Sequence, residues 1–280
     1  MISKNFVIRF YKYLGKNKMD YSYKEVDKAL ENRISAHAKY SNFNLHEWLI
    51  GKFEIKQADN ILDLGCGDGN FIDLFWNSIK PNGKLHAIDI NTDLINIAKK
   101  RHKSLSDNVT IEAIDYDKLS FSDLQYNWIF SIYSIYYTQD PASLVNDLAK
   151  HMLDNAKFVI TGPSSKNALE LDEINLAVTG KKRNAEDFSR MHRIEEEFTK
   201  LFSTVFGKNK TSLEFVDTQM SFPTAEEYAT YYWSTLLWRE SSAGRTNQEI
   251  SILKDKTLDV IKKMPNFVLN KQMSCLVGTS

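Results

Sequence analysis

Cysteine is scarce in this chain of 280 residues, and long apolar runs are absent. The two cysteines, Cys66 and Cys275, lie far apart in contexts that indicate neither a disulfide framework nor a metal site. No apolar run reaches the roughly 18 residues that a membrane-spanning helix needs. We therefore expect a protein of the reducing cytoplasm with no membrane span and no bound metal.

An excess of either charge is also lacking. Lysine plus arginine equals aspartate plus glutamate at 36 each, so no global field attracts the protein to polyanions, and we expect no nucleic-acid partner. A local basic groove stays open. Met1–Met19 is basic and contains no acid, but Arg9 and Lys12 interrupt its apolar part. It makes a poor signal peptide, and a packed helix competes with a membrane-surface or targeting helix.

The strongest pattern that is present is a glycine turn. Asn60–Phe71 reads NILDLGCGDGNF, an apolar strand that runs into three glycines. An amphipathic helix follows. Glycine permits positive φ and lets a ligand approach the backbone, and the start of the helix presents unpaired N–H groups. The turn is therefore expected to serve a nucleotide-like ligand; its glycines are Gly65, Gly67 and Gly69.

The acid before this turn indicates which ligand it serves. The fingerprint of dinucleotide enzymes is G-x-G-x-x-G, whereas here the third glycine comes one residue early and Asn70 follows it. Asp63 would repel a pyrophosphate but attract a cationic ligand, and S-adenosylmethionine (SAM) carries an ammonium and a sulfonium. Asp63–Gly69 resembles the first motif of class I SAM-dependent methyltransferases, D/E-x-G-x-G-x-G, at every specified position. The resemblance implies that Asp63 and the glycines contact SAM.

Two later strands supply further positions for this ligand. Asp89 ends a predicted strand about 20 residues beyond the glycines, where doubly wound nucleotide domains place the acid that binds ribose. The resemblance assigns Asp89 to the ribose hydroxyls and Ile90 to the adenine face. It also assigns Asp115, after the predicted strand Val109–Ile114, to the adenine amino group, with Tyr116 near the ring. Ile114 stands where the family often has glycine.

The fourth motif of the family is matched less well. The predicted strand Trp128–Tyr133 is preceded by Asn127 in place of the usual aspartate, and Tyr136-Tyr137 replace a common His-His pair. The resemblance places Tyr136 near the methyl group as a substrate contact and Ser131 at the cofactor. No N/D-P-P-Y/F motif follows the strand, which argues against DNA adenine and glutamine side chains as acceptors.

The N-terminal part from Tyr21 to Phe53 is predicted to be helical. Arg33, His37 and Tyr40 are spaced by four and three residues, so they share one helix face. The segment resembles the helical cover over SAM in small-molecule methyltransferases, which makes Arg33 and Tyr40 candidate cofactor contacts. His37 is a candidate catalytic base, although a structural histidine is the simpler interpretation.

The order of the predicted elements indicates one α/β architecture. Alternating strands and helices give a doubly wound, mostly parallel sheet with ligands at the carboxyl ends of the strands. We expect seven strands in a Rossmann-like methyltransferase fold, with an N-terminal helical cap and a helical insertion before the last strand. Ala225–Trp238 is predicted to be an aromatic helix, either a substrate wall or core. The expected parts are a cap (1–55), a SAM-binding core (56–165) and a lid with the closing strands (166–280).

The sequence therefore predicts a SAM-dependent methyltransferase that releases S-adenosylhomocysteine. Methyl transfer from a sulfonium mainly requires alignment, and a base is needed only where the nucleophile must lose a proton. The acceptor is expected to be the O, N or C atom of a small molecule. An RNA or protein methyltransferase and a SAM-binding subunit without catalysis are the alternatives. Monomer and homodimer both stay open.

Overall fold

The computed structural model of this protein describes residues 27–119 and 124–280. The basic segment Met1–Met19, and with it the alternative of a membrane-surface or targeting helix, lies outside the described residues. Within the described part of the chain, no helix is long and apolar enough to cross a membrane.

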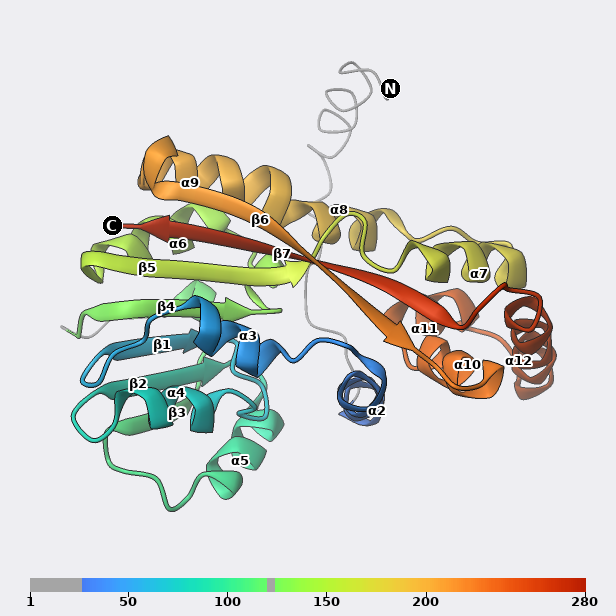
Figure 1. The fold of residues 1–280 in the computed structure, drawn as a ribbon, viewed down its shortest axis with the longest axis horizontal. Helices are drawn as coiled ribbons and strands as arrows, with labels where there is room; N and C mark the ends of the chain where they lie inside the picture. The colour runs from blue at the N-terminus through green and yellow to red at the C-terminus, as the bar shows by residue number, and fades with distance from the viewer. Residues whose placement is uncertain (1–26, 120–123) are drawn as a thin grey trace.

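A single seven-stranded sheet organises the chain (Figure 1). The strand order is β3-β2-β1-β4-β5-β7-β6, with β1 to β5 parallel and β7 antiparallel to both of its neighbours. This order confirms the doubly wound, mostly parallel architecture. The strands are β1 (Asn60–Leu64), β2 (Lys84–Asp89), β3 (Val109–Ala113), β4 (Tyr126–Ile132), β5 (Met152–Pro163), β6 (Thr211–Ser221) and β7 (Val268–Thr279).

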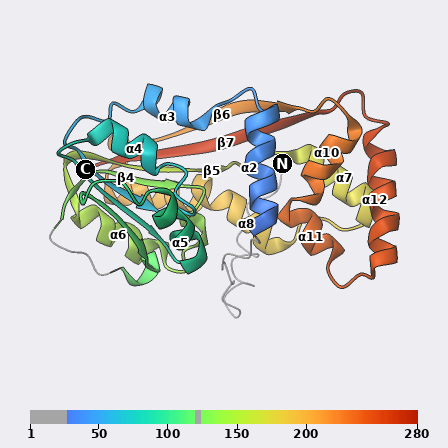
Figure 2. The ribbon, with the colours of Figure 1, turned by 90° about the horizontal axis from the view of Figure 1, so that it is seen from below.

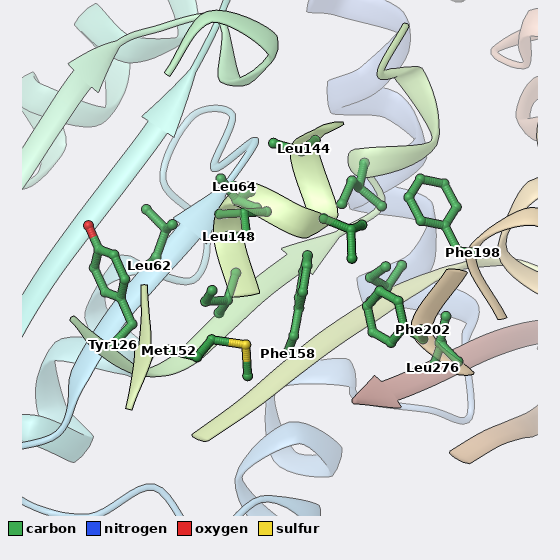
Figure 3. Packing of buried hydrophobic residues seen from close by; sticks show 14 of the residues in the cluster. Leu62, Leu64, Tyr126, Leu144, Leu148, Met152, Phe158, Phe198, Phe202 and Leu276 are labelled. Carbon is green, nitrogen blue, oxygen red and sulfur yellow. The ribbon is translucent and has the colours of Figure 1, made fainter. Parts of the chain in front are cut away.

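Helices pack on both faces of the sheet, as the near-continuous apolar strands require. Leu62, Leu64 and Phe158 point from β1 and β5 toward α6 and α9 on one face (Figure 3). Ile61 and Phe130 face α3 and α4 on the other. On the first face lie α6 (Pro141–Lys150), α8 (Ala185–Arg193), a π-helical turn (Ile194–Phe198) and α9 (Thr199–Val205); on the second lie α3 (Leu45–Lys52), α4 (Ile72–Ile79) and α5 (Thr92–Arg101).

A separate helical lid lies beyond one end of the sheet. β6 and β7 form a long ribbon that reaches from the sheet into this lid, where Met220 and Leu269 join its core (Figure 1). Three of the lid helices connect β6 to β7, which confirms the insertion before the last strand. The lid helices are α7 (Leu169–Thr179), α10 (Ala225–Trp233), α11 (Leu236–Ser242) and α12 (Asn247–Ile261).

The N-terminal helix α2 (Asp27–Tyr40) lies between the sheet and the lid (Figure 2). Arg33 Nη1 donates to the Ser234 carbonyl (3.0 Å), and Tyr40 packs its ring on Phe222. Figure 2 shows α2 between the helices of the core and α10 to α12, so its side chains can reach both parts of the chain.

One predicted boundary is wrong. The aromatic helix expected over Ala225–Trp238 is interrupted because the Ser234 and Thr235 hydroxyls donate to the Tyr231 and Tyr232 carbonyls, and Thr235 then caps α11. A local departure of the backbone also occurs in β5, where Asn155 adopts a φ of 60° within the strand.

Candidate functional site

The glycine turn lies at the carboxyl end of β1, beside the end of β2. The N–H groups of Gly65 and Cys66 both donate to the Ile88 carbonyl (2.8 and 2.9 Å), which holds the turn against β2. All three glycines have positive φ, at 76°, 56° and 86° for Gly65, Gly67 and Gly69. Side chains other than glycine are strained in this region.

Only one of the three glycines borders open space. A Cβ on Gly65 would overlap Ser134 Oγ, and one on Gly69 would lie 3.0 Å from His102 Nε2. A Cβ on Gly67 meets nothing within 4 Å. Gly65 and Gly69 are therefore required by packing, whereas Gly67 is where a ligand can approach the backbone.

Asp89 links the turn to the second strand. Its Oδ2 accepts the Gly67 N–H (2.9 Å), and its Oδ1 accepts the Asn91 N–H (2.8 Å). Each carboxylate oxygen keeps a lone pair for a ribose hydroxyl. The structure thus brings Gly67 and Asp89 together, as expected. Burial raises the pKa of Asp89, and the two N–H donors oppose that rise.

Asp63 is the most unusual charge of the turn. Its side chain is 1% exposed, and Oδ2 has no hydrogen-bond partner among the described residues. Burial, followed by the charge of Asp89, raises the pKa of Asp63 to about 7. Two carboxylates in a poorly solvated place repel each other, so a cation bound at the turn would stabilise both. With almost no exposed surface, Asp63 acts on such a cation through its charge.

The predicted adenine contacts lie around the ends of β2 and β3. The Ile114 N–H donates to the Asp89 carbonyl (2.9 Å), and the Ile90 side chain is 58% exposed. Asp115 caps the following turn through the Asp117 N–H and forms an ion pair with Lys118. The Tyr116 hydroxyl donates to the Ser134 carbonyl (3.3 Å), which connects β3 to the segment after β4. An apolar face and an acid thus lie beside Asp89.

Ser131 joins β4 to the glycine turn. It has no exposed surface; its hydroxyl donates to the Leu64 carbonyl (3.2 Å) and accepts the Ile135 N–H (2.9 Å). A buried hydroxyl with both bonds made positions the turn, and the direct cofactor contact of Ser131 stays a prediction. The residue that packs on the turn is Ser134, which the motif comparison missed.

Tyr136 packs into the core next to the segment that follows β4. The residue is 5% exposed and lies against Gly162 and Ile194. The substrate contact of Tyr136 stays a prediction, and this side chain has little exposed surface for it. Tyr133, with a φ of 57° directly after β4, is 43% exposed and takes the outward position. Its left-handed backbone reverses the alternation that the apolar pattern implies.

The predicted face of α2 meets the lid. Tyr40 donates to Glu227 (2.6 Å). His37 Nε2 lies 3.4 Å from the Tyr231 hydroxyl. Burial, then the charges of Lys271 and Arg33, lower the pKa of His37 to about 3. The described contacts of these α2 residues are with the lid and its ribbon.

The aromatic residues of α10 are mainly core. Tyr228, Tyr231 and Tyr232 are at most 4% exposed, and Tyr232 donates to Asn175 (2.7 Å) inside the lid. Of the two interpretations, the core is therefore the correct one for these three side chains. Tyr231 lies at the edge of this core, where it meets His37.

The residues of the turn fit SAM. The uncompensated Asp63 suits a cation, Asp89 suits ribose hydroxyls, Gly67 leaves room for the ligand and Ile90 offers an apolar face. A pyrophosphate would bring negative charge to the buried carboxylate of Asp63 and the partly buried carboxylate of Asp89. No cluster of metal-binding side chains occurs among residues 27–119 and 124–280.

Comparison with known proteins agrees with this geometry. The family model described as a methyltransferase domain matches residues 55–217. The chain is 26% identical over 130 residues to a malonyl-[acyl-carrier protein] O-methyltransferase of Marinomonas sp., covering 45% of this chain and 47% of that protein. It is 24% identical over 153 residues to a sterol 4-C-methyltransferase of Caenorhabditis elegans, covering 54% and 42%. The chain spans less than half the length of these two relatives.

A solved structure shares the fold more widely. The YcgJ protein from Bacillus subtilis superposes with a TM-score of 0.52 at 14% identity, over 84% of this chain and 97% of that one. The matched region of the family model contains the glycine turn, Asp89 and Asp115, the residues on which the site is built. The chain therefore belongs to the methyltransferase domain family, and its core is a class I SAM-dependent methyltransferase domain.

Proposed function

We propose that this protein binds SAM at the glycine turn and transfers its methyl group to a small-molecule acceptor held between α2, Tyr133 and the lid. One observation carries the proposal: an open Gly67 lies beside a buried carboxylate, Asp63, and a partly buried one, Asp89, and Asp63 Oδ2 lacks a hydrogen-bond partner in the described chain. A nucleoside with a positive charge, such as SAM, would fit both the open backbone at Gly67 and the carboxylates beside it.

The residues of this chain would bind SAM and align its methyl group with the acceptor. Bound SAM supplies an activated methyl group on a sulfonium, so alignment is the main demand on the protein. Asp89 would hold the ribose, Ile90 and Asp115 the adenine, and the turn the amino-acid part. Ser131 holds the turn to β4. Tyr133 lies beside the turn through its neighbour Ser134, and it also lies near Tyr231 of the lid.

The parts of the chain divide this work. Residues 56–165 would bind SAM, residues 1–55 would cover it, and residues 166–280 would close the sheet and hold the acceptor. The contacts of α2 with Ser234 and Glu227 support this division, since they join the cover to the lid. The role of Arg33 and Tyr40 as cofactor contacts stays a prediction.

His37 is a poor candidate for a general base. With its pKa lowered to about 3, the imidazole is neutral at physiological pH but accepts a proton weakly. Although 43% of the residue is exposed, the hydroxyl of Tyr133 is surrounded by protein, and this burial raises the pKa of the phenol, which therefore stays protonated. The site therefore favours an acceptor whose nucleophilic atom is already free of its proton.

Small-molecule acceptors are supported by the two relatives, whose names give a malonyl-[acyl-carrier protein] and a sterol. The alternatives are an RNA or protein acceptor, and a subunit that binds SAM without catalysis. The balanced charge of the chain does not favour RNA. Release of S-adenosylhomocysteine with any acceptor would exclude the non-catalytic alternative.

The test is calorimetric titration of the protein with SAM, S-adenosylhomocysteine and NAD. We expect micromolar binding of the first two and none of NAD. Asp89→Ala should abolish binding, because it removes the acceptor for Gly67 and for ribose. Asp107→Asn, which removes an exposed carboxylate, is the matched control. Binding of NAD alone, or of no nucleotide, would overturn the proposal.

A further inference from the structure

A lysine of the long ribbon lies in the space between α2 and the lid. Lys271 is on β7, opposite Thr218, and its Nζ donates to the Tyr231 hydroxyl (3.4 Å). It forms no ion pair within the described residues. It also borders a hollow of about 360 Å³, whose other lining residues are Asn42, Asp217, Thr218, Gln219 and Asn270. A half-buried ammonium next to open space can accept an anion.

Two carboxylates on the elements around Lys271 have other partners. Asp217 pairs across the ribbon with Gln272 and accepts a hydrogen bond from Gln272 Nε2 (2.7 Å), although Asp217 lines the same hollow as Lys271. Glu227, one turn before Tyr231 on α10, accepts from Lys39 (3.0 Å) and Tyr40 (2.6 Å). Neither acid forms an ion pair with Lys271.

Lys271, Tyr231 and His37 form one relay of hydrogen bonds. Lysine can only donate, so the Tyr231 oxygen accepts from Lys271 and its hydroxyl is left to donate to His37 Nε2. This assignment leaves His37 neutral with its proton on Nδ1. The low pKa of His37 agrees, since Lys271 and Arg33 both oppose a second proton on the ring. The relay therefore presents cationic and N–H donors and no negative charge.

We propose that Lys271, positioned by Tyr231 and His37, binds the carboxylate of an acidic small-molecule acceptor, and that a carboxylate oxygen receives the methyl group. This inference rests on the proposed function. The carboxylate enters from the open side of the relay, with Tyr133 as a wall near the glycine turn.

A carboxylate also suits a site without a general base. It is ionised at neutral pH, so no proton has to be removed before transfer. In the transfer, the carboxylate oxygen forms a bond to the methyl carbon, and the pair of electrons from the broken carbon–sulfur bond stays on sulfur. The negative acceptor and the positive donor both become neutral, and no proton moves. The product is a methyl ester.

Binding is tested without turnover by nuclear magnetic resonance on protein labelled at histidine, with His37→Gln used to assign the ring. The probes are octanoate and benzoate, with octanamide and benzamide as uncharged controls, all in the presence of saturating S-adenosylhomocysteine. We expect the two acids, and neither amide, to shift the His37 signals and raise its pKa, because an anion beside an imidazole favours the protonated form.

Variants test whether Lys271 is responsible for acid binding and for the pKa of His37. Lys271→Met should raise the pKa of His37 in the free protein and weaken acid binding about 10- to 100-fold, the loss expected for a charge-assisted contact. Lys271→Arg should preserve binding. Lys262→Met, which removes an exposed lysine paired with Glu226, should change neither quantity. Equal effects of acids and amides, or unchanged acid binding in Lys271→Met, would overturn the proposal.

The atom that receives the methyl group is tested with the acids that bind. Label transferred from radioactive SAM should become volatile methanol in mild alkali, as for a methyl ester. Label that resists alkali, or no transfer to any acid that binds, would overturn the assignment of the carboxylate oxygen. Failure of the proposed function would be seen separately, since S-adenosylhomocysteine itself would then not bind in the calorimeter.

Discussion

Replacing Asp63 by asparagine should stabilise the unliganded protein at pH 8 and weaken its binding of SAM. The pKa of Asp63 is raised from 3.8 to about 7, mainly by burial. One pKa unit corresponds to about 1.4 kcal/mol, so the ionised side chain lowers the free energy of unfolding by about 4 kcal/mol at pH above 7. Relaxation of the protein around the site reduces this effect, so we expect the free energies of unfolding of Asp63→Asn and wild type to differ by about 2–4 kcal/mol at pH 8.

The contribution of Asp63 to the free energy of unfolding changes with pH in a defined direction. Between pH 4 and 7 the native state keeps a proton on Asp63 that the unfolded chain has already released. The free energy of unfolding therefore falls as pH rises through this window and is level above it, and Asp63→Asn removes this contribution. Asp89 stays titratable in both proteins, so the comparison isolates Asp63.

The assay is urea denaturation of wild type and Asp63→Asn, without ligand, at pH 4.5, 6 and 8. The difference in the free energy of unfolding between Asp63→Asn and wild type should be small at pH 4.5 and largest at pH 8. Asp107→Asn, at an exposed acid, should follow wild type throughout. Calorimetry should show that wild type loses SAM affinity below pH 7, and that the variant binds weakly at every pH. Equal slopes of stability with pH in Asp63→Asn and wild type would refute the reasoning.

Three further predictions concern the same region. Gly69→Ala should lower the free energy of unfolding by about 1–3 kcal/mol, because the new Cβ meets His102. Gly67→Ala should lose less stability but more SAM affinity, as measured by denaturation and calorimetry. Equal effects of the two variants on binding and on folding would contradict this. His37→Gln should leave the shape of the pH profile of kcat/KM unchanged between pH 6 and 8, because a group with a pKa of about 3 does not titrate there. A rise of kcat/KM with pH that occurs in wild type but not in the variant would contradict this prediction. Tyr133→Ala should raise KM for the acceptor while Tyr136→Phe changes it little, and steady-state kinetics with the reverse order would contradict the placement of the two rings.

The arrangement of the proposed cofactor half could be predicted from the sequence because its signals are local. A strand, three glycines and a helix fix the turn, and the Rossmann-like order brings Asp89 to it wherever β2 pairs with β1. The register of Asp63 opposite Ala87 follows from the same pairing. The sequence therefore indicated the residues whose positions depend on the sheet alone.

The proposed acceptor half could not be predicted because it depends on contacts between distant segments. His37, Tyr133, Tyr231 and Lys271 come from four parts of the chain that meet only when the lid packs on α2. The burial of Ser131 and Tyr136 could not be predicted either, for a local reason. The left-handed residue Tyr133 changes which side chains face outward after β4, and an apolar pattern does not reveal a positive φ at tyrosine.

The ribbon of β6 and β7 also bears on how such an enzyme can change its specificity. The eleven paired positions from Thr211 and Gly278 to Ser221 and Val268 continue without a bulge up to the inserted helices. Because the insertion starts where a hairpin would simply turn, it can be exchanged, lengthened or removed without altering the register of any strand below it. New acceptors can thus be acquired at the tip of the ribbon while the half of the protein that handles the methyl donor is inherited intact.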